Sequence, residues 1–146
     1  MTNIEKRMMR NPDTDYFHFH NQNPKNKFTE DCVFRAISLA TGIDYNEVIL
    51  SMARNSCKNG YCLNGTKGIE TYLKSIGWIK HKQPRKSDNT KFTGKEFCAI
   101  IQSSFNPNRK YIANIGGHHI VAIVDGKIND TWNSSGGCIG NFWTKE

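Results

Sequence analysis

Three residues whose types could form a nucleophilic site stand where elements of the fold should begin or end. Cys32 lies at the expected start of a helix, His119 opens an apolar stretch near the end of the chain, and Asp130 lies on the next stretch. A thiol nucleophile, an imidazole base and a carboxylate that orients the imidazole are the parts of a Cys-His-Asp site. If the fold brings them together, we expect a thiol enzyme.

The position of Cys32 favours the reactive form of its thiol. A free thiol, with a pKa of about 8.5, is mostly protonated at neutral pH, whereas a helix N-terminus and a nearby imidazolium both favour the thiolate. The histidine can later protonate the leaving group, and its other ring nitrogen needs an acceptor such as Asp130. The backbone N–H of Cys32 and an upstream amide could hold the oxyanion.

The pairing of His119 with Asp130 follows from a hairpin signal. Asp125-Gly126 is a strong two-residue turn pattern between two apolar stretches. With this turn His119 lies opposite Trp132, and Asp130 is its diagonal neighbour on the same face, at roughly 7–8 Å between backbones. A ring and a carboxylate can touch across that separation, so His119 with Asp130 is the leading pairing.

A second pairing stays open. In the same register His118 points to the other face of the hairpin, with Asn133 opposite. A three-residue turn would slip the register and exchange the two faces. His118 with Asn133 is therefore the fallback pairing.

The apolar pattern places helices before strands. Residues 29–42 have the spacing of an amphipathic helix, which Thr29 or Asp31 could cap, and capping-box patterns begin at Asp44 and Thr93. Helices followed by consecutive antiparallel strands indicate an α+β fold. The predicted helices cover 29–42, 44–54 and 66–76, and a fourth begins at residue 93. The predicted strands cover 110–115, 119–124, 127–132 and 138–143.

The length of 146 residues suits one compact domain. Residues 1–28 are polar with two Asn-Pro pairs and are expected to form an extended arm, so residues 29–146 would be the single domain. Residues 55–65 are expected to form a loop, and residues 80–92 a basic connector.

Together these pieces resemble the papain-like cysteine peptidases, especially the compact bacterial and phage members close to the C39 and CHAP groups. Cys32 matches the nucleophile that opens the family's central helix, and His119 before Ile-Val-Ala-Ile matches its strand-opening histidine. Asp130-Thr131-Trp132 looks like the Asn-Ser-Trp of papain, whose amide orients the histidine. The resemblance implies a papain-like fold, with the nucleophile helix packed on a C-terminal antiparallel sheet.

The resemblance also implies two supporting roles. Papain has a glutamine six residues before its cysteine that helps bind the oxyanion, and the matching residue is Asn26, a shorter amide. Gln22 and Asn23 are the other candidates for that donor. Trp132 is expected to shield the histidine–carboxylate hydrogen bond, as in the family, or to pack in the core.

The charge balance favours an anionic partner. The formal net charge is +7 and the isoelectric point about 9.2, and a basic stretch at 80–95 could bind a polyanion such as nucleic acid. The charged N-terminus lacks an apolar signal region, and no apolar run approaches the roughly 18 residues of a membrane helix. We therefore expect a cytoplasmic protein, or one of the host cytoplasm if phage-encoded, with no membrane partner.

The cysteines indicate free thiols rather than a disulfide framework, since the chain has 5 of them at irregular spacing. Cys57 and Cys62, with His18 and His20, could suggest zinc, but their spacing is loose and no second tight pair exists. The sequence therefore predicts neither a metal nor a cofactor. Structural roles are expected for the remaining thiols, Cys98 and Cys138.

These features predict acyl transfer from an amide to water through a thioester on Cys32. The expected substrate is a peptide or isopeptide bond in a protein, a peptide or a cell-wall peptide. The same triad supports peptidoglycan hydrolase, deamidase and acyltransferase chemistry, because a fold and a triad do not fix the acceptor. An alternative of another class is a non-catalytic module that binds nucleic acid through the basic 80–95 loop.

Overall fold

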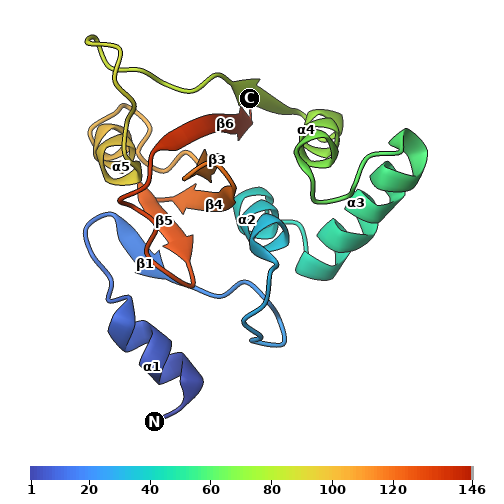
Figure 1. Ribbon diagram of the computed structural model, residues 1–146, viewed down its shortest axis with the longest axis horizontal. Coiled ribbons are helices and arrows are strands. Elements are labelled where there is room, and N and C mark those ends of the chain that lie inside the picture. The colour runs from blue at the N-terminus through green and yellow to red at the C-terminus, as the bar shows by residue number, and fades with distance from the viewer. Residues whose placement is uncertain (146) are drawn as a thin grey trace.

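A computed structural model describes residues 1–145 and has an α+β fold, in which N-terminal helices precede most of a six-stranded mixed, mostly antiparallel sheet (Figure 1). This confirms the predicted fold class. The helices are α1 (Asn3–Arg10), α2 (Cys32–Thr41), α3 (Tyr45–Asn59), α4 (Thr66–Ser75) and α5 (Gly94–Gln102). The strands are β1 (Phe17–Phe19), β2 (Trp78–His81), β3 (Tyr111–Ile115), β4 (His119–Val124), β5 (Lys127–Asp130) and β6 (Ile139–Lys145).

The sheet has the strand order β1-β5-β4-β3-β6-β2. β1 joins β5 in parallel, and every other neighbouring pair is antiparallel. In the β4–β5 hairpin Val124 pairs with Lys127, so the predicted register is confirmed. Asp125 and Gly126 both have positive φ, 54° and 71°, as a two-residue turn of this hand requires.

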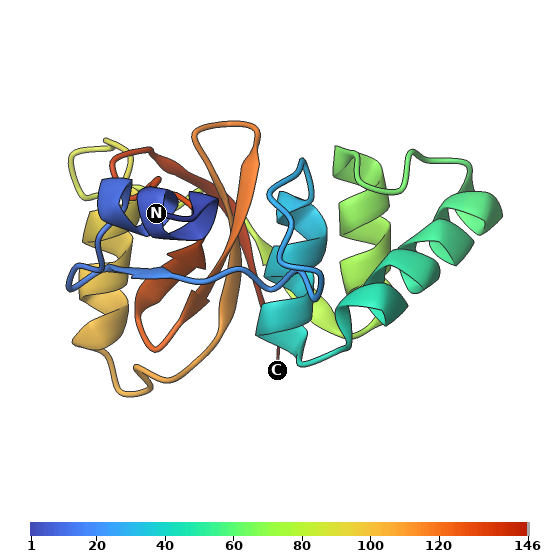
Figure 2. The ribbon, with the colours of Figure 1, turned by 90° about the horizontal axis from the view of Figure 1, so that it is seen from below.

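Helices cover both faces of the sheet. α5 lies on one face and α2 on the other, with α3 and α4 on the side of α2 (Figures 1 and 2). The apolar side chains of β3 and β4 alternate between the two faces and therefore serve two separate cores. The core under α2 includes Ile37, Leu73, Ile112, Ile120 and Ala122, and the core under α5 includes Phe97, Cys98, Ala113, Val121 and Ile123.

The N-terminal segment is not extended throughout, as residues 1–28 were expected to be. It contains α1, which buries no side chain, and β1, whose Phe17 is fully buried. Phe19 pairs with Asp130, and the His20 N–H donates to the Asp130 carbonyl at 2.9 Å. β1 therefore holds the end of β5. A strand of three residues is too short to give a recognisable period, which is why the sequence did not indicate it.

Several element ends also differ from expectation. Asp31 precedes α2, but its carboxylate makes no capping hydrogen bond, because it is engaged by other side chains. Asp44 caps α3 as predicted, yet this helix continues to Asn59 into the expected loop. α4 begins at Thr66 as predicted, and the first two residues of the expected 80–92 connector belong instead to β2, which pairs with β6. None of the helices within residues 1–145 is long and apolar enough to cross a bilayer.

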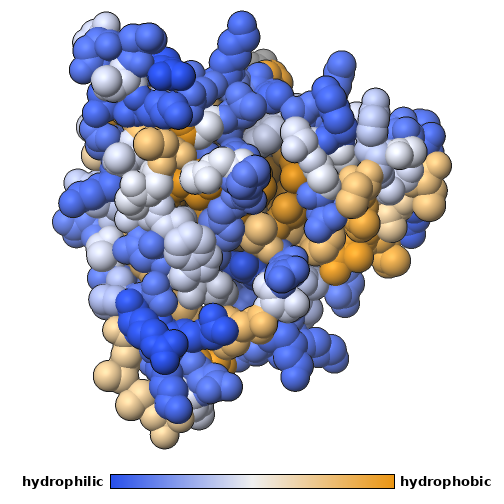
Figure 3. Space-filling view, viewed as in Figure 1, coloured by the Kyte–Doolittle hydropathy of each residue, from blue (hydrophilic) through white to orange (hydrophobic). Residues whose placement is uncertain are grey.

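Figure 3 shows mostly hydrophilic side chains on the face viewed in Figure 1, with hydrophobic ones gathered around α3. Leu50 of α3 is half exposed. The site described next lies elsewhere, where α2 meets the β4–β5 hairpin.

Candidate active site

Cys32 is the first residue of α2 and lines a pocket of about 410 Å³. The first N–H groups of a helix have no acceptor within it, so the N–H of Cys32 is available to an oxyanion. His119, the first residue of β4, lines the same pocket, and so do Arg35 and Trp132. The rest of the pocket wall consists of Arg7, Phe28, Thr29, Glu30, Asp31 and Thr131.

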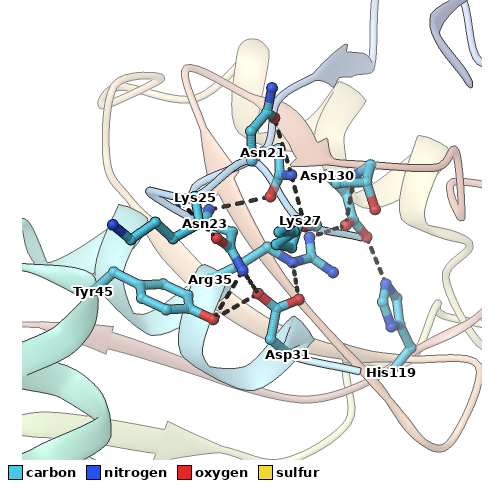
Figure 4. Close-up of polar contacts among 11 residues, drawn as sticks. Asn21, Asn23, Lys25, Lys27, Asp31, Arg35, Tyr45, His119 and Asp130 are labelled. Atoms are coloured by element: carbon cyan, nitrogen blue, oxygen red, sulfur yellow. Dashed lines mark hydrogen bonds and ion pairs between the residues drawn. The ribbon is translucent and has the colours of Figure 1, made fainter. Parts of the chain in front are cut away.

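His119 and Asp130 are in direct contact across the hairpin. The Nε2 of His119 lies 2.5 Å from the Oδ2 of Asp130, which is 1% exposed (Figure 4). With Nε2 committed to the carboxylate, Nδ1 is the ring nitrogen left for the thiol of Cys32. The structure thus brings Cys32, His119 and Asp130 to one place, in the order expected for a nucleophile, its base and an orienting carboxylate.

The electrostatics of the pair favour a thiolate and an imidazolium. Burial alone would raise the pKa of the Cys32 thiol, but hydrogen bonding to His119 and to the Ile120 backbone, with the charges of His119 and Arg35, holds that pKa below its ordinary value. Burial also disfavours a charged imidazole, yet hydrogen bonds with Asp130 and Cys32 and the charges of both raise the pKa of His119 to about 9. The two shifts have the same consequence, because both favour a thiolate beside an imidazolium.

Trp132 packs beside the base. Its ring centroid lies 4.8 Å from that of His119 with the planes tilted by 39°, and the indole remains 46% exposed. Trp132 therefore lies against the His119 ring, and both side chains line the pocket. The backbone N–H of Thr131 donates to the Oδ1 of Asp130 at 2.7 Å.

Arg35 is a member of the site that sequence reasoning missed. It lies one turn after Cys32 on α2 and is 8% exposed. Its Nη1 donates to the Oδ1 of Asp130 at 2.6 Å, and its Nε donates to the Oδ1 of Asp31 at 2.8 Å (Figure 4). The spacing of Asp31 and Arg35 by four residues, with Cys32 between them, was a signal in the sequence that could have identified it.

Asp31 carries further support for this arginine. Its Oδ2 accepts hydrogen bonds from the Tyr45 hydroxyl at 2.7 Å and from the Asn23 amide at 3.0 Å. Burial and the neighbouring Asp31 carboxylate raise the pKa of Tyr45, so the phenol stays protonated as a donor. α3 and the loop before α2 are therefore joined to the same polar cluster.

The amides proposed for the oxyanion are not brought to Cys32. Asn26 is exposed, has a positive φ of 54° and contacts the Asn21 amide. The Gln22 amide donates to the Ser38 hydroxyl at 3.1 Å, and that of Asn23 donates to Asp31. None of the three lines the pocket that holds Cys32.

His118 and Asn133, the fallback pair, line a second pocket, but within residues 1–145 no hydrogen bond joins their side chains. His118 is exposed, whereas the Asn133 amide oxygen accepts from the Ser135 N–H at 3.0 Å within its own loop. The backbone N–H of Asn133 donates to the Asn11 side chain at 2.9 Å, which attaches the end of α1 to this loop. His119 is therefore the histidine that faces the thiol.

Other sequence features lie away from this pocket. Within residues 1–145 no group of three or more His, Cys, Asp or Glu side chains is arranged to hold a metal ion. Cys57 and Cys62 are free and exposed. In the basic 80–95 stretch, Lys80 pairs with Glu70 at 2.5 Å and Lys86 pairs with Glu96, so part of its positive charge is compensated.

The geometry of the pocket is the basis for assigning a function. Comparisons of the chain with protein-family models, with curated proteins and with solved structures find no match.

Proposed function

We propose that the protein is a thiol hydrolase that cleaves a peptide, isopeptide or related amide bond, with a papain-like arrangement of Cys32, His119 and Asp130. The observation that carries this proposal is the contact of 2.5 Å between His119 and Asp130 in the pocket that also holds Cys32 at the start of α2. The lowered pKa of the Cys32 thiol agrees with it. Perturbed titration and convergent geometry together mark a functional site better than either alone.

The proposed reaction has two acyl-transfer steps. The Cys32 thiolate attacks the amide carbonyl, and the oxyanion that forms is held by the Cys32 backbone N–H. The His119 imidazolium gives its proton to the leaving amine, which departs as the thioester forms. The neutral imidazole then takes a proton from water as the resulting hydroxide attacks the thioester, the Cys32 thiolate is expelled, and the acid product leaves with the thiolate–imidazolium pair restored. Asp130 keeps the ring oriented throughout.

The pocket walls suit a polymeric or side-chain amide reached from solvent. Phe28 and Trp132 supply aromatic surface, and the guanidinium of Arg7 lies 4.1 Å from the centre of the Phe28 ring. Arg7 and Glu30 add one charge of each sign at the pocket wall. The aromatic rings could bind an apolar part of a substrate, while the charged groups orient its polar part.

The same triad can serve several acceptors, so peptidoglycan hydrolysis, deamidation and acyl transfer are alternatives that share the proposed Cys32 thioester. The non-catalytic nucleic-acid module is less well supported. Lys80 and Lys86, which would contact phosphates, already have carboxylate partners, and such pairing reduces the attraction for a polyanion.

A reactive acyl donor tests the proposal without knowledge of the natural substrate. After brief exposure to p-nitrophenyl acetate, we expect a single acetyl group on Cys32, sensitive to hydroxylamine, located by peptide mass spectrometry. Cys32→Ala should not be acylated, whereas Cys138→Ala, which removes an exposed thiol, should behave like the natural chain. Acylation of the exposed thiols with none on Cys32 would refute a nucleophilic role for Cys32.

A further inference from the structure

A buried arginine connects the helix of the candidate nucleophile with the strand of the candidate orienting carboxylate. Arg35 belongs to α2 and contacts Asp130 at the end of β5, 95 residues away in the sequence. Few long cationic side chains are buried this completely, and those that are usually have defined partners. We propose that Arg35 is a positioning residue, which fixes the Asp130 carboxylate for His119 and keeps Cys32 as a thiolate; this inference rests on the proposed function.

The two oxygens of Asp130 have separate partners. Oδ1 accepts from the Arg35 guanidinium at 2.6 Å and from the Thr131 N–H at 2.7 Å, whereas Oδ2 is left for His119 at 2.5 Å. A planar guanidinium holds a carboxylate with more directional constraint than a lysine ammonium does. With Oδ1 held twice, the carboxylate cannot rotate, and Oδ2 stays in line with the imidazole.

Arg35 is itself held in place from its other side. Its Nε donates to Asp31 at 2.8 Å, and Asp31 is fixed in turn by Tyr45 and Asn23 (Figure 4). The guanidinium therefore lies between two buried carboxylates. These two contacts fix the plane of the guanidinium without any contact to His119. Such outer contacts are how proteins orient the groups that act directly.

The helix gives Arg35 and Cys32 a fixed separation. Residues three apart lie on the same side of a helix, so both side chains face the hairpin when α2 packs on the sheet. Around the thiol, the cationic groups are His119 from β4, Arg35 from α2 and Arg7 from α1. The anionic groups are Asp31 and Glu30, which precede α2, and Asp130 from β5.

Without Arg35, two buried carboxylates would remain near the thiol with less compensating charge. An anion beside a thiol disfavours the thiolate, and an unpaired buried carboxylate tends to move or to take up a proton. Both effects would act on the reactivity of Cys32, which gives the inference a measurable consequence besides stability.

The test compares Arg35→Ala, Arg35→Lys and the natural chain by the rate of Cys32 alkylation with iodoacetamide against pH, read by mass spectrometry. In Arg35→Ala we expect the midpoint to rise by about one pH unit, the low end of the range for an opposite charge, because the charge of Arg35 lowers the pKa of Cys32 less than the contacts with His119 do. Millimolar guanidinium ion should restore part of the rate in this variant. Arg54→Ala removes an exposed arginine paired with Glu47 and is the matched control, with no change expected.

Arg35→Lys keeps the charge and most of the volume, so it serves if the alanine variant does not fold. We expect its alkylation midpoint near that of the natural chain but a turnover of p-nitrophenyl acetate roughly tenfold or more lower, because misplacement of a catalytic group by about 1 Å can cost about 10²-fold. A folded Arg35→Ala with the natural alkylation profile, or an Arg35→Lys with the natural turnover, would overturn the inference and leave the proposed function standing. A natural chain whose Cys32 titrates like a free thiol would instead refute the proposed function.

Discussion

Two helices on opposite faces of the sheet each carry a cysteine, and the two thiols have opposite chemistry. Cys32 opens α2 and lines a pocket, whereas Cys98 lies within α5 and is fully buried in the apolar core. Burial raises the pKa of the Cys98 thiol to about 12, and only the Ile128 backbone opposes it. Burial acts on Cys32 in the same direction, yet its pKa is lowered.

The difference comes from what each thiol faces. The Cys32 side has an imidazole, a guanidinium and a helix N-terminus, all of which favour a thiolate. The Cys98 side offers aromatic and aliphatic side chains such as Phe97 and Ile101. Desolvation thus keeps the Cys98 thiol under α5 protonated. At Cys32 in α2, the imidazole, the guanidinium and the backbone contact outweigh the same effect of desolvation.

The largest expected contrast is in alkylation of the natural chain. After brief iodoacetamide treatment near pH 6.5, peptide mass spectrometry should find Cys32 labelled first and Cys98 unlabelled, because the Cys98 thiol is inaccessible and protonated. Unfolding in urea should expose Cys98 and remove the contrast. An inert Cys32 with rapid labelling of Cys57 or Cys62 in the folded protein would contradict this account.

Removing the base should make Cys32 resemble an ordinary thiol. In His119→Ala we expect the midpoint of alkylation to move up toward about 8.5 and turnover of an acyl donor to fall by about 10²–10⁴-fold, the usual contribution of a general acid–base. His118→Ala alters an exposed neighbour and is the control. Loss of activity in His118→Ala with none in His119→Ala would move the base to the other histidine.

Asp130→Ala should have a smaller effect than His119→Ala. The imidazole would lose the hydrogen-bond acceptor that helps raise the pKa of His119 to about 9, so its pKa, followed by nuclear magnetic resonance of the ring, should fall. In a serine triad a wrong tautomer can cost about 10⁴-fold. We expect less here, since the lowered pKa of Cys32 and the raised pKa of His119 favour a thiolate–imidazolium pair before substrate binds. Asn133→Ala should be mild, and a loss as severe as that of Asp130→Ala would contradict the assignment.

Turnover should fall at both acid and alkaline pH, because different residues titrate on the two sides. Activity should rise with pH as Cys32 loses its proton at its lowered pKa, and it should fall above about 9 as His119 loses the proton that the leaving group needs. Alkylation of Cys32 needs no acid, so its rate should not fall on the alkaline side. A parallel alkaline decline in alkylation would show that unfolding, and not the imidazolium, sets that limit.

Local signals predicted the part of the site that lies within one hairpin. Asp125-Gly126 set the register, and the register placed His119 beside Asp130 without knowledge of the rest of the fold. The amphipathic pattern likewise placed Cys32 at the start of a helix. Each of these inferences spans few residues, where period and turn chemistry are strong.

Long-range contacts escaped prediction for a physical reason. β1 joins the sheet in parallel with β5, and Arg35 meets Asp130, both across about a hundred residues of sequence. Neither contact produces a periodic pattern in the sequence from which it could be predicted. Asn26 is exposed and does not line the Cys32 pocket, and its positive φ belongs to a loop conformation that a motif position does not encode.

The smallest expected effect on the site comes from a substitution in the core under α5, on the opposite face of the sheet from α2. Cys98→Ser places a hydroxyl in the apolar core under α5, where an unsatisfied polar group costs about 1–3 kcal/mol in protein mutants. Urea denaturation followed by circular dichroism should show this loss, with Cys98→Ala as the comparison that removes the sulfur without adding a hydroxyl. Because the two cores lie on opposite faces of the sheet, the pH midpoint of Cys32 alkylation should stay the same in the folded variant. A shifted midpoint would show that packing under α5 reaches His119 through β4, and the two thiols could then no longer be treated as independent.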